Sequence, residues 1–201
     1  MDYYYENNAL LKGYKTICGI DEAGRGPLAG PVYAAAVILP TGLEIAGLND
    51  SKKLSEKKRE QLFDVICEKA IAYSVGIATE KEIDDINILN ATFLAMKRAV
   101  EGLEIKPDYA LIDGNCYPHI EGVTEEIVVK GDAKSMSIAA ASILAKVSRD
   151  RFMLELTEKY PEYCFDKHKG YGTKLHYEKL AEFGPSQIHR MTFLKKLYGE
   201  K

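Results

Sequence analysis

Short apolar runs alternate along this chain with longer stretches in which apolar residues recur every three or four positions. Continuous apolar runs at 17–20 and 32–39 predict two buried strands, and apolar alternation over 72–78 predicts a third. Shorter runs that end in turn residues predict two more strands, at 109–112 and 127–129. We therefore expect five strands.

Amphipathic spacing predicts five helices, which lie between and after these strands. They are expected at residues 54–70, 81–103, 135–156, 173–183 and 191–198. Because strands come first, then alternate with helices, and helices follow, the pattern predicts an α/β fold with a mixed sheet flanked by helices. Residues 1–201 are expected to form a single domain, with an N-terminal tail over about 1–15 and a helical C-terminal extension over about 174–201.

The first predicted strand runs directly into two carboxylates, Asp21 and Glu22, and then into a turn made of Gly24, Arg25 and Gly26. Acids at the end of a buried strand are costly unless a cation or hydrogen bonds compensate them. Glycines on either side of an arginine let the backbone approach a bulky anion closely. The segment suggests a metal ion and a phosphate meeting at one strand end.

Two other interpretations of this segment compete with a metal site. An isolated Asp-Glu pair is by default a solvated surface turn, but here two predicted core strands flank it. Gly24-x-Gly26-x-x-Ala29 also matches a dinucleotide-binding fingerprint, which must open a helix. Pro31 and the strand predicted after it exclude that helix.

Carboxylates recur at the ends of three predicted strands. Asp113 and Asp132 each lie beside a glycine just after a short apolar run, as Asp21 and Glu22 do after theirs. Singly, Asp113-Gly is a common turn and Asp132 could cap the helix that follows. Together, four carboxylates at one sheet edge would form an all-oxygen site for Mg²⁺ or Mn²⁺.

The neighbours Asp21 and Glu22 present a geometric difficulty. In a regular strand they point to opposite faces. Both can reach one metal cluster only if the chain twists or bulges there, which the following Ala23-Gly24 permits.

Composition narrows the function classes. The four cysteines are scattered, which supports neither a zinc site nor a disulfide framework and fits a reducing cytoplasm. No apolar run is long enough to span a bilayer, and the polar N-terminus does not resemble a signal peptide, so no membrane partner is expected. Residues 1–129 carry a net charge of −8 and residues 130–201 carry +5, and a basic C-terminal part suits a nucleic-acid partner. His119, His176 and His189 form no recognisable motif and are expected to be structural or exposed.

Several longer motifs resemble those of bacterial ribonuclease HII, a family of type 2 ribonucleases H. They span nearly the whole chain and occur in the family's order. They are Gly19-Ile-Asp-Glu-Ala-Gly-Arg-Gly-Pro27, Asp50-Ser-Lys-Lys-Leu-Ser55, Glu82-Ile-Asp-Asp-Ile-Asn87, Asp113-Gly-Asn115, Lys130-Gly-Asp-Ala-Lys-Ser135, the stretch from Ala139 to Arg151, and Lys169-Gly-Tyr-Gly-Thr173.

The resemblance implies an RNase H-like fold and an endonuclease that cuts RNA joined to DNA. In that family the substrates include single ribonucleotides embedded in duplex DNA, cut on their 5′ side to leave a 3′-hydroxyl. Asp21, Glu22, Asp113 and Asp132 match the family's metal-binding carboxylates, which implies catalysis with two Mn²⁺ or Mg²⁺ ions.

The resemblance also implies substrate-binding residues. Gly24, Arg25 and Gly26 match a turn that reads the ribose 2′-hydroxyl, the group that distinguishes RNA from DNA. Tyr171 matches a tyrosine that stacks on the sugar at an RNA-to-DNA junction, although a core tyrosine is the alternative.

Three lysines are candidates for phosphate contacts. Lys52 and Lys53 are candidates as a group, and Lys146 lies on the alanine-rich helix one turn after Ser142. For any single lysine, a solvated surface role is the alternative.

Other functions compete with this interpretation. The sister family ribonuclease HIII carries a different residue at the position of Arg25 and has an extra N-terminal domain. A non-catalytic module that binds hybrid duplexes would gain nothing from four carboxylates beside phosphate. A junction resolvase would need neither the Gly-Arg-Gly turn nor Tyr171. A monomer is expected, and the helix predicted at 191–198 either packs on the domain or docks a replication protein.

Overall fold

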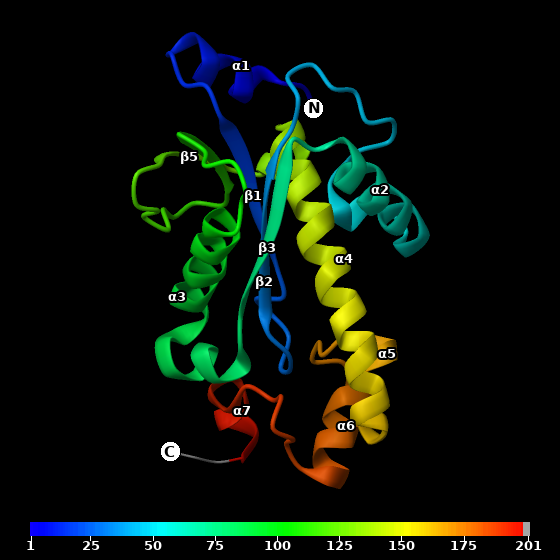
Figure 1. The fold of residues 1–201 in the computed structure, drawn as a ribbon. Helices are drawn as coiled ribbons and strands as arrows, with labels where there is room; N and C mark the ends of the chain where they lie inside the picture. The colour runs from blue at the N-terminus through cyan, green and yellow to red at the C-terminus, as the bar shows by residue number, and fades with distance from the viewer. Residues whose placement is uncertain (199–201) are drawn as a thin grey trace.

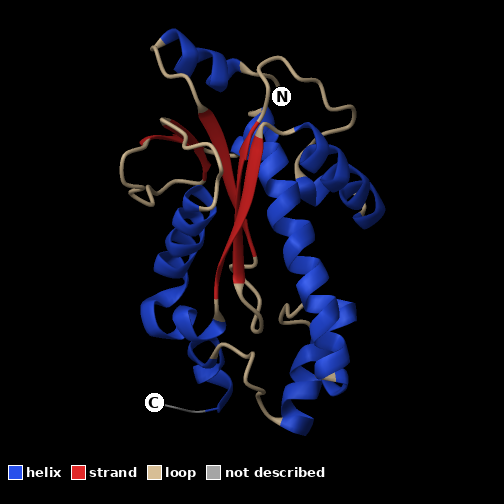
Figure 2. Ribbon diagram, viewed as in Figure 1, coloured by secondary structure: helices blue, strands red, loops and turns tan. Residues whose placement is uncertain are grey.

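The computed structural model describes residues 1–198 and is built on one five-stranded sheet (Figures 1 and 2). The strands are β1 (Ile17–Ala23), β2 (Val32–Ile38), β3 (Ala72–Ala78), β4 (Tyr109–Asp113) and β5 (Thr124–Val128). Their order across the sheet is β3-β2-β1-β4-β5. β2 is antiparallel to both β1 and β3, whereas β1, β4 and β5 are parallel. The sheet is therefore mixed, as predicted.

Helices cover both faces of the sheet (Figure 1). They are α1 (Tyr4–Leu11), α2 (Glu56–Lys69), α3 (Glu80–Glu101), α4 (Met136–Lys159), α5 (Phe165–His168), α6 (Lys174–Phe183) and α7 (Met191–Tyr198). Three short 3₁₀ turns are η1 (Ser51–Lys53), η2 (Gly131–Ala133) and η3 (Pro161–Tyr163). Helix α3 packs on one face, and α4 with α2 packs on the other.

Successive side chains of each strand point to opposite faces of the sheet, so the two faces contribute to two separate hydrophobic cores. In β2, Ala34 and Ala36 belong to the core under α3, whereas Ala35 and Val37 belong to the core under α4. In β1, a Cβ atom on Gly19 would lie 2.2 Å from the backbone carbon of Ser137. Since only glycine fits there, the start of α4 lies directly against β1.

Strand β1 is longer than predicted. Its pairing with β2 continues to the Ala23–Tyr33 pair, so Asp21 and Glu22 lie inside the strand and do not follow it. The register is continuous, and no bulge occurs between these two residues. The expected strand end at residue 20 was wrong because antiparallel pairing with β2 extends β1 past its apolar run.

The segment expected to be an N-terminal tail contains α1. Glu6 on this helix is buried and accepts hydrogen bonds from the Ser135 hydroxyl at 2.7 Å and the Ser137 N–H at 3.0 Å. Both partners lie at the N-terminus of α4, where free N–H groups favour a carboxylate. Helix α1 therefore fixes the start of α4.

The helical C-terminal part is present as predicted and packs against the far end of α4. Its core includes Met153, Phe165, Leu180 and Leu194. The Asp84 carboxylate accepts from the N–H groups at the start of α7, at 2.8 and 2.9 Å. Within residues 1–198, none of the helices combines the length and apolar character that crossing a membrane requires.

Candidate active site

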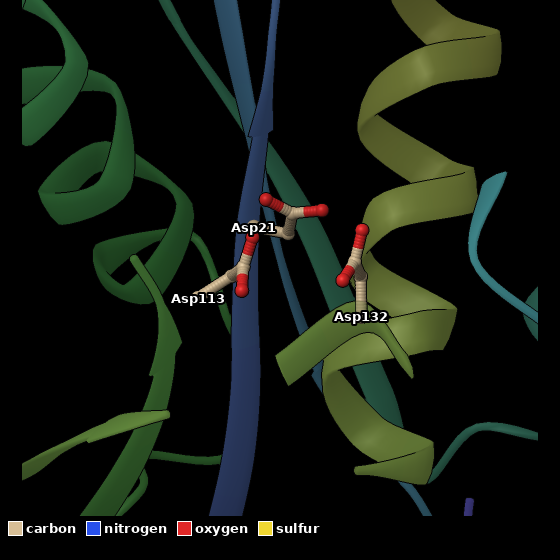
Figure 3. Close-up of side chains that lie close together, drawn as sticks. All are labelled: Asp21, Asp113 and Asp132. Atoms are coloured by element: carbon tan, nitrogen blue, oxygen red, sulfur yellow. The ribbon is translucent and has the colours of Figure 1, made fainter. Parts of the chain in front are cut away.

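Three aspartates from distant parts of the chain meet at the carboxyl end of β1 and β4 (Figure 3). Asp21 lies in β1, Asp113 ends β4, and Asp132 lies in η2 just before α4. One carboxylate oxygen from each lies within 4.8 Å of those from the other two. Because β1 and β4 are parallel and in register, Asp21 and Asp113 project from the same end and the same face of the sheet.

These carboxylates are held together against their mutual repulsion. Asp21 is only 4% exposed, and burial together with the neighbouring Glu22 and Asp113 raises its pKa well above the ordinary value. Burial also raises the pKa of Asp113, and Asp132 adds to the effect, although the Gly131 N–H donates to Asp113 at 2.6 Å. A site of this kind favours a bound cation.

Glu22 lies on the other face of β1. With no bulge after Asp21, its side chain projects towards α3, where Phe93 and Met96 border the same hollow. Burial raises the Glu22 pKa, while Arg25, whose Nη1 lies 3.4 Å from Glu22 Oε1, opposes the shift. Three carboxylates rather than four thus gather in one cluster, and Asp113 also borders the hollow beside Glu22.

A cavity of about 240 Å³ opens beside the aspartates. It brings together segments that are far apart in sequence. Its lining comprises Asp21, Glu22, Ala23, Gly24, Arg25, Gly26, Ser51, Lys52, Asp113, Ser142, Lys146 and Tyr171. The acids, the Gly24–Gly26 turn and Tyr171 therefore share one pocket, while Asp132 adjoins it through Lys52.

The three candidate lysines differ in position. Lys52 Nζ lies 3.4 Å from an Asp132 carboxylate oxygen, and the residue lines the pocket. Lys53 does not line the pocket, and its Nζ lies 3.9 Å from the Asp50 carboxylate. Lys146 lines the pocket and donates to Asp150 at 2.6 Å. The structure thus separates Lys52 from Lys53, which the sequence could not do.

The donor set fits a hard divalent cation. The cluster offers only carboxylate oxygens, the ligands that Mg²⁺ and Mn²⁺ prefer. Among residues 1–198, Lys52 is the one cation that forms an ion pair with any of the three aspartates; it pairs with Asp132, and its side chain is 77% exposed. Burial and neighbouring acids raise the pKa of Asp21 and of Asp113, so the negative charges of these two carboxylates would be stabilised by a bound cation.

Three histidines that the sequence did not connect support the loop that carries Tyr171. We call His168, His176 and His189 the histidine group; all three are buried, whereas His119 is exposed. The His168 and His176 rings stack with centroids 4.4 Å apart, and His176 Nε2 lies 3.0 Å from His189 Nε2. The structural role expected for His176 and His189 agrees with this burial.

Backbone groups fix the proton positions in this group. The Tyr171 carbonyl can only accept, so His176 Nδ1 donates to it and His176 Nε2 is an acceptor. His189 Nε2 then donates to His176, and His189 Nδ1 accepts from the Ser186 N–H at 2.9 Å. Tyr171 is itself 41% exposed, so its ring faces the open pocket while its backbone is held from behind.

Two buried arginines near the pocket were also missed by sequence reasoning. Arg149 and Arg190 are both fully buried, and each donates to backbone carbonyls of the segment 24–31. Arginine in a basic C-terminal region predicts a surface position, so no local signal identifies them.

Comparison with known proteins gives consistent results. The family model for ribonuclease HII matches residues 18–196. Ribonuclease HII of Caldicellulosiruptor bescii is 58% identical over 192 residues, which cover 96% of this chain and 93% of that protein. The crystal structure of ribonuclease H2 from Pyrococcus horikoshii OT3 has a TM-score of 0.74 at 28% identity, covering 93% of this chain and all of that one.

This chain is also similar to an archaeal protein whose structure was solved in a complex. RNase HII from Archaeoglobus fulgidus, solved with PCNA, has a TM-score of 0.72 at 28% identity and covers 88% of this chain and 94% of its own. The fold is therefore RNase H-like, as the motifs implied. With the family model spanning almost the entire chain, and Asp21, Asp113 and the glycine turn in one pocket, this chain belongs to the ribonuclease HII family of metal-dependent nucleases.

Proposed function

We propose that this ribonuclease H hydrolyses RNA in RNA–DNA hybrids and at single ribonucleotides embedded in duplex DNA. Cleavage occurs on the 5′ side of the ribonucleotide and leaves a 3′-hydroxyl and a 5′-phosphate. The observation that carries the proposal is the shared pocket, in which clustered acids lie beside a Gly-Arg-Gly turn and an exposed tyrosine.

Asp21, Asp113 and Asp132 would hold Mn²⁺ or Mg²⁺, and Glu22 would act from the other side of β1. Ions held by these acids would supply activation of a water molecule and stabilisation of the leaving oxygen of the phosphodiester. The position of Glu22 supports a site with two ions, because Glu22 and Asp113 both border the aspartate pocket and also the hollow beside α3.

The remaining pocket residues would recognise the substrate. Gly24, Arg25 and Gly26 would contact the ribose 2′-hydroxyl, and Tyr171 would stack on the following sugar. Lys52 and Lys146 are placed to contact the backbone phosphates flanking the cut, since both line the pocket. Lys53 lies outside the pocket, so its contribution would be limited to long-range attraction.

The protein would act as a monomer on duplex DNA that contains RNA. Helix α7 buries Leu194 in the core but leaves Met191 and Leu197 about half exposed, at 46% and 47%. Docking of a replication protein through this helix remains a prediction, which the archaeal complex with PCNA makes worth testing.

Cleavage of an end-labelled DNA duplex with one ribonucleotide tests the proposal. Wild type and Asp113→Asn are compared in Mg²⁺, Mn²⁺ and chelator, and Asp85→Asn, an exposed change on α3 outside the pocket, is the matched control. We expect a metal-dependent cut 5′ to the ribonucleotide with wild type and Asp85→Asn, and none with Asp113→Asn.

Two outcomes would contradict the proposal. Cleavage of long RNA tracts alone would remove the role assigned to Arg25 and Tyr171 while leaving the metal site intact. Tight binding without cleavage in either metal would identify a binding module in place of an enzyme.

A further inference from the structure

The buried guanidinium of Arg190 lies behind the Gly24–Gly26 turn without a carboxylate partner. Arg190 is fully buried, and no ion pair within residues 1–198 includes it. Burying an unpaired charge is expensive, so this position needs an explanation. Burial and the nearby Arg149 charge lower the Arg190 pKa to about 9, which still leaves it charged at neutral pH.

All of its side-chain hydrogen bonds go to backbone carbonyls of the segment 24–30, and two of the three acceptors lie in the Gly24–Gly26 turn. Nη2 donates to the Gly24 carbonyl at 2.6 Å, Nη1 to Arg25 at 3.0 Å and Nε to Gly30 at 2.8 Å. The planar guanidinium presents its donors on three separate nitrogens at fixed angles, whereas the three donors of a lysine ammonium share one nitrogen and cannot span these three carbonyls. The backbone of Arg190 is fixed too, because its N–H donates to the Leu28 carbonyl at 2.9 Å.

The hydrogen bonds to the Gly24 and Arg25 carbonyls also determine the direction of the next N–H group in each peptide, those of Arg25 and Gly26. The peptide bonds are trans, so each N–H is directed away from the carbonyl of the preceding residue. The Gly24 and Arg25 carbonyls face Arg190, and therefore the N–H groups of Arg25 and Gly26 face away from it. Arg25 and Gly26 line the pocket and Arg190 does not.

These two N–H groups are available to a ligand. Neither has a hydrogen-bond partner among the described residues, although neighbouring N–H groups of Leu28 and Gly30 are bonded to backbone carbonyls. Two adjacent donors aimed in one direction suit a single hydroxyl oxygen that accepts from both.

The turn can adopt this form because Gly24 has a φ of +97° and no side chain. A Cβ atom there would lie 2.1 Å from Arg149 Nε, so the second buried arginine closes the space beneath it. Arg149 also donates to the Ala29 and Pro31 carbonyls, at 3.1 Å each. On the side of the turn that faces away from the pocket, Arg149 and Arg190 thus bond the backbone carbonyls of residues 24, 25 and 29–31.

We propose that Arg190 is a positioning residue that orients the Arg25 and Gly26 N–H groups towards the substrate and so sets the preference for a ribose 2′-hydroxyl. This inference rests on the proposed function, because it concerns the same turn. Arg190 acts from behind, through the backbone, and touches neither the substrate nor the metal-binding acids.

Binding measurements on Arg190→Lys test this role. The affinities for a DNA duplex with one ribonucleotide and for the same all-DNA duplex are compared in Ca²⁺, with the metal present but cleavage suppressed. Loss of two neutral hydrogen bonds is expected to reduce the ratio of these affinities by about 10- to 30-fold. Arg98→Lys, a change at an exposed arginine that also bonds a carbonyl, is expected to keep the wild-type ratio.

Two further readouts separate positioning from general damage. The melting temperature and the Mn²⁺ affinity of Arg190→Lys report folding and the acid cluster independently of ribose selection. A folded variant that binds Mn²⁺ normally and keeps the wild-type ribose preference would overturn the inference. If wild type itself showed no preference and no cleavage, the proposed function would fail instead.

A measurement on the wild-type protein covers the case in which Arg190→Lys does not fold. In ¹⁵N-labelled protein, the amide resonances of Arg25 and Gly26 are expected to shift with the ribonucleotide duplex and not with the all-DNA duplex. Identical shifts with both duplexes would also overturn the inference.

Discussion

Acidification from pH 7.5 to 4.5 is expected to destabilise the fold through the histidine group. Burial lowers the pKa of both His176 and His189 to about 4, from an ordinary value of 6.5. Because the folded pKa is the lower one, the unfolded chain binds protons first as the pH falls. This contribution to stability is complete above about pH 6.5 and is lost progressively towards pH 4.

The magnitude follows from the shared hydrogen bond. His176 Nε2 accepts from His189 Nε2, so one added proton removes the acceptor and breaks the bond. Counting a single proton over the difference between the two pKa values gives ~3 kcal/mol. For a chain of this size, ~3 kcal/mol corresponds to roughly 6–12 °C in Tm.

Thermal unfolding followed by circular dichroism at several pH values measures this effect. The double variant His176→Asn/His189→Gln keeps donor groups but cannot titrate, so its Tm should fall less on acidification than that of wild type. His119→Gln, at the exposed histidine, should retain the wild-type dependence.

The comparison between variants is needed because other groups act in the opposite sense. Burial raises the pKa of Asp21 and Asp113, so protonation of these acids favours the folded state as the pH falls. An equal loss of Tm in wild type and in the double variant would refute the assignment to the histidines.

Three further predictions concern the pocket. Asp113→Asn should raise the Tm in chelator, because it relieves repulsion among buried acids. It should also abolish the rise in Tm that Mn²⁺ gives wild type, and a retained Mn²⁺ effect in calorimetry would exclude Asp113 as a ligand. Lys52→Ala should lower kcat/KM on the ribonucleotide duplex by about 10-fold, because Lys52 would make a charge-assisted contact with a phosphate. The adjacent Lys53→Ala should lower it less than 3-fold, because Lys53 would act only as a distant charge, and equal losses would mean that the pocket does not distinguish the two lysines. Tyr171→Ala should lower kcat/KM by about 10-fold through lost stacking and Tyr171→Phe should remain close to wild type, so an equal loss in Tyr171→Phe would indicate a role for the hydroxyl.

Local signals in the sequence identified most regular elements. Ser55, Thr173 and Ser135 cap α2, α6 and α4 through their side chains, as their residue types suggest. The convergence of Asp21 and Asp113 was also expected, because carboxylates near the ends of apolar strands can meet at one edge of a sheet; the parallel pairing of β1 with β4 brings them together.

Features that depend on packing between distant segments were not predictable. The pairing of β1 with β2 decides that Glu22 faces α3, and the hydrogen bonds from the start of α4 to Glu6 decide where the helix at residues 4–11 docks. Arg190 acquires its partners only when the C-terminal part packs against the segment 24–31, whereas His189 bonds to Ser186 and His176 within the C-terminal part itself. Charge and polarity in the sequence favour the surface for both, whereas their buried hydrogen bonds determine the observed positions.

The hydrogen bond from Arg190 to Gly24 joins residues 166 positions apart. During synthesis the segment 24–31 leaves the ribosome long before Arg190, its buried support, has been made. Asp21, Asp113 and Asp132 also all precede Arg190 in the chain. A nascent chain therefore has its acids before it has an ordered turn beside them. If Arg190 orients the turn as proposed, a chain released before residue 190 is expected to bind the metal but to lack the preference for ribose.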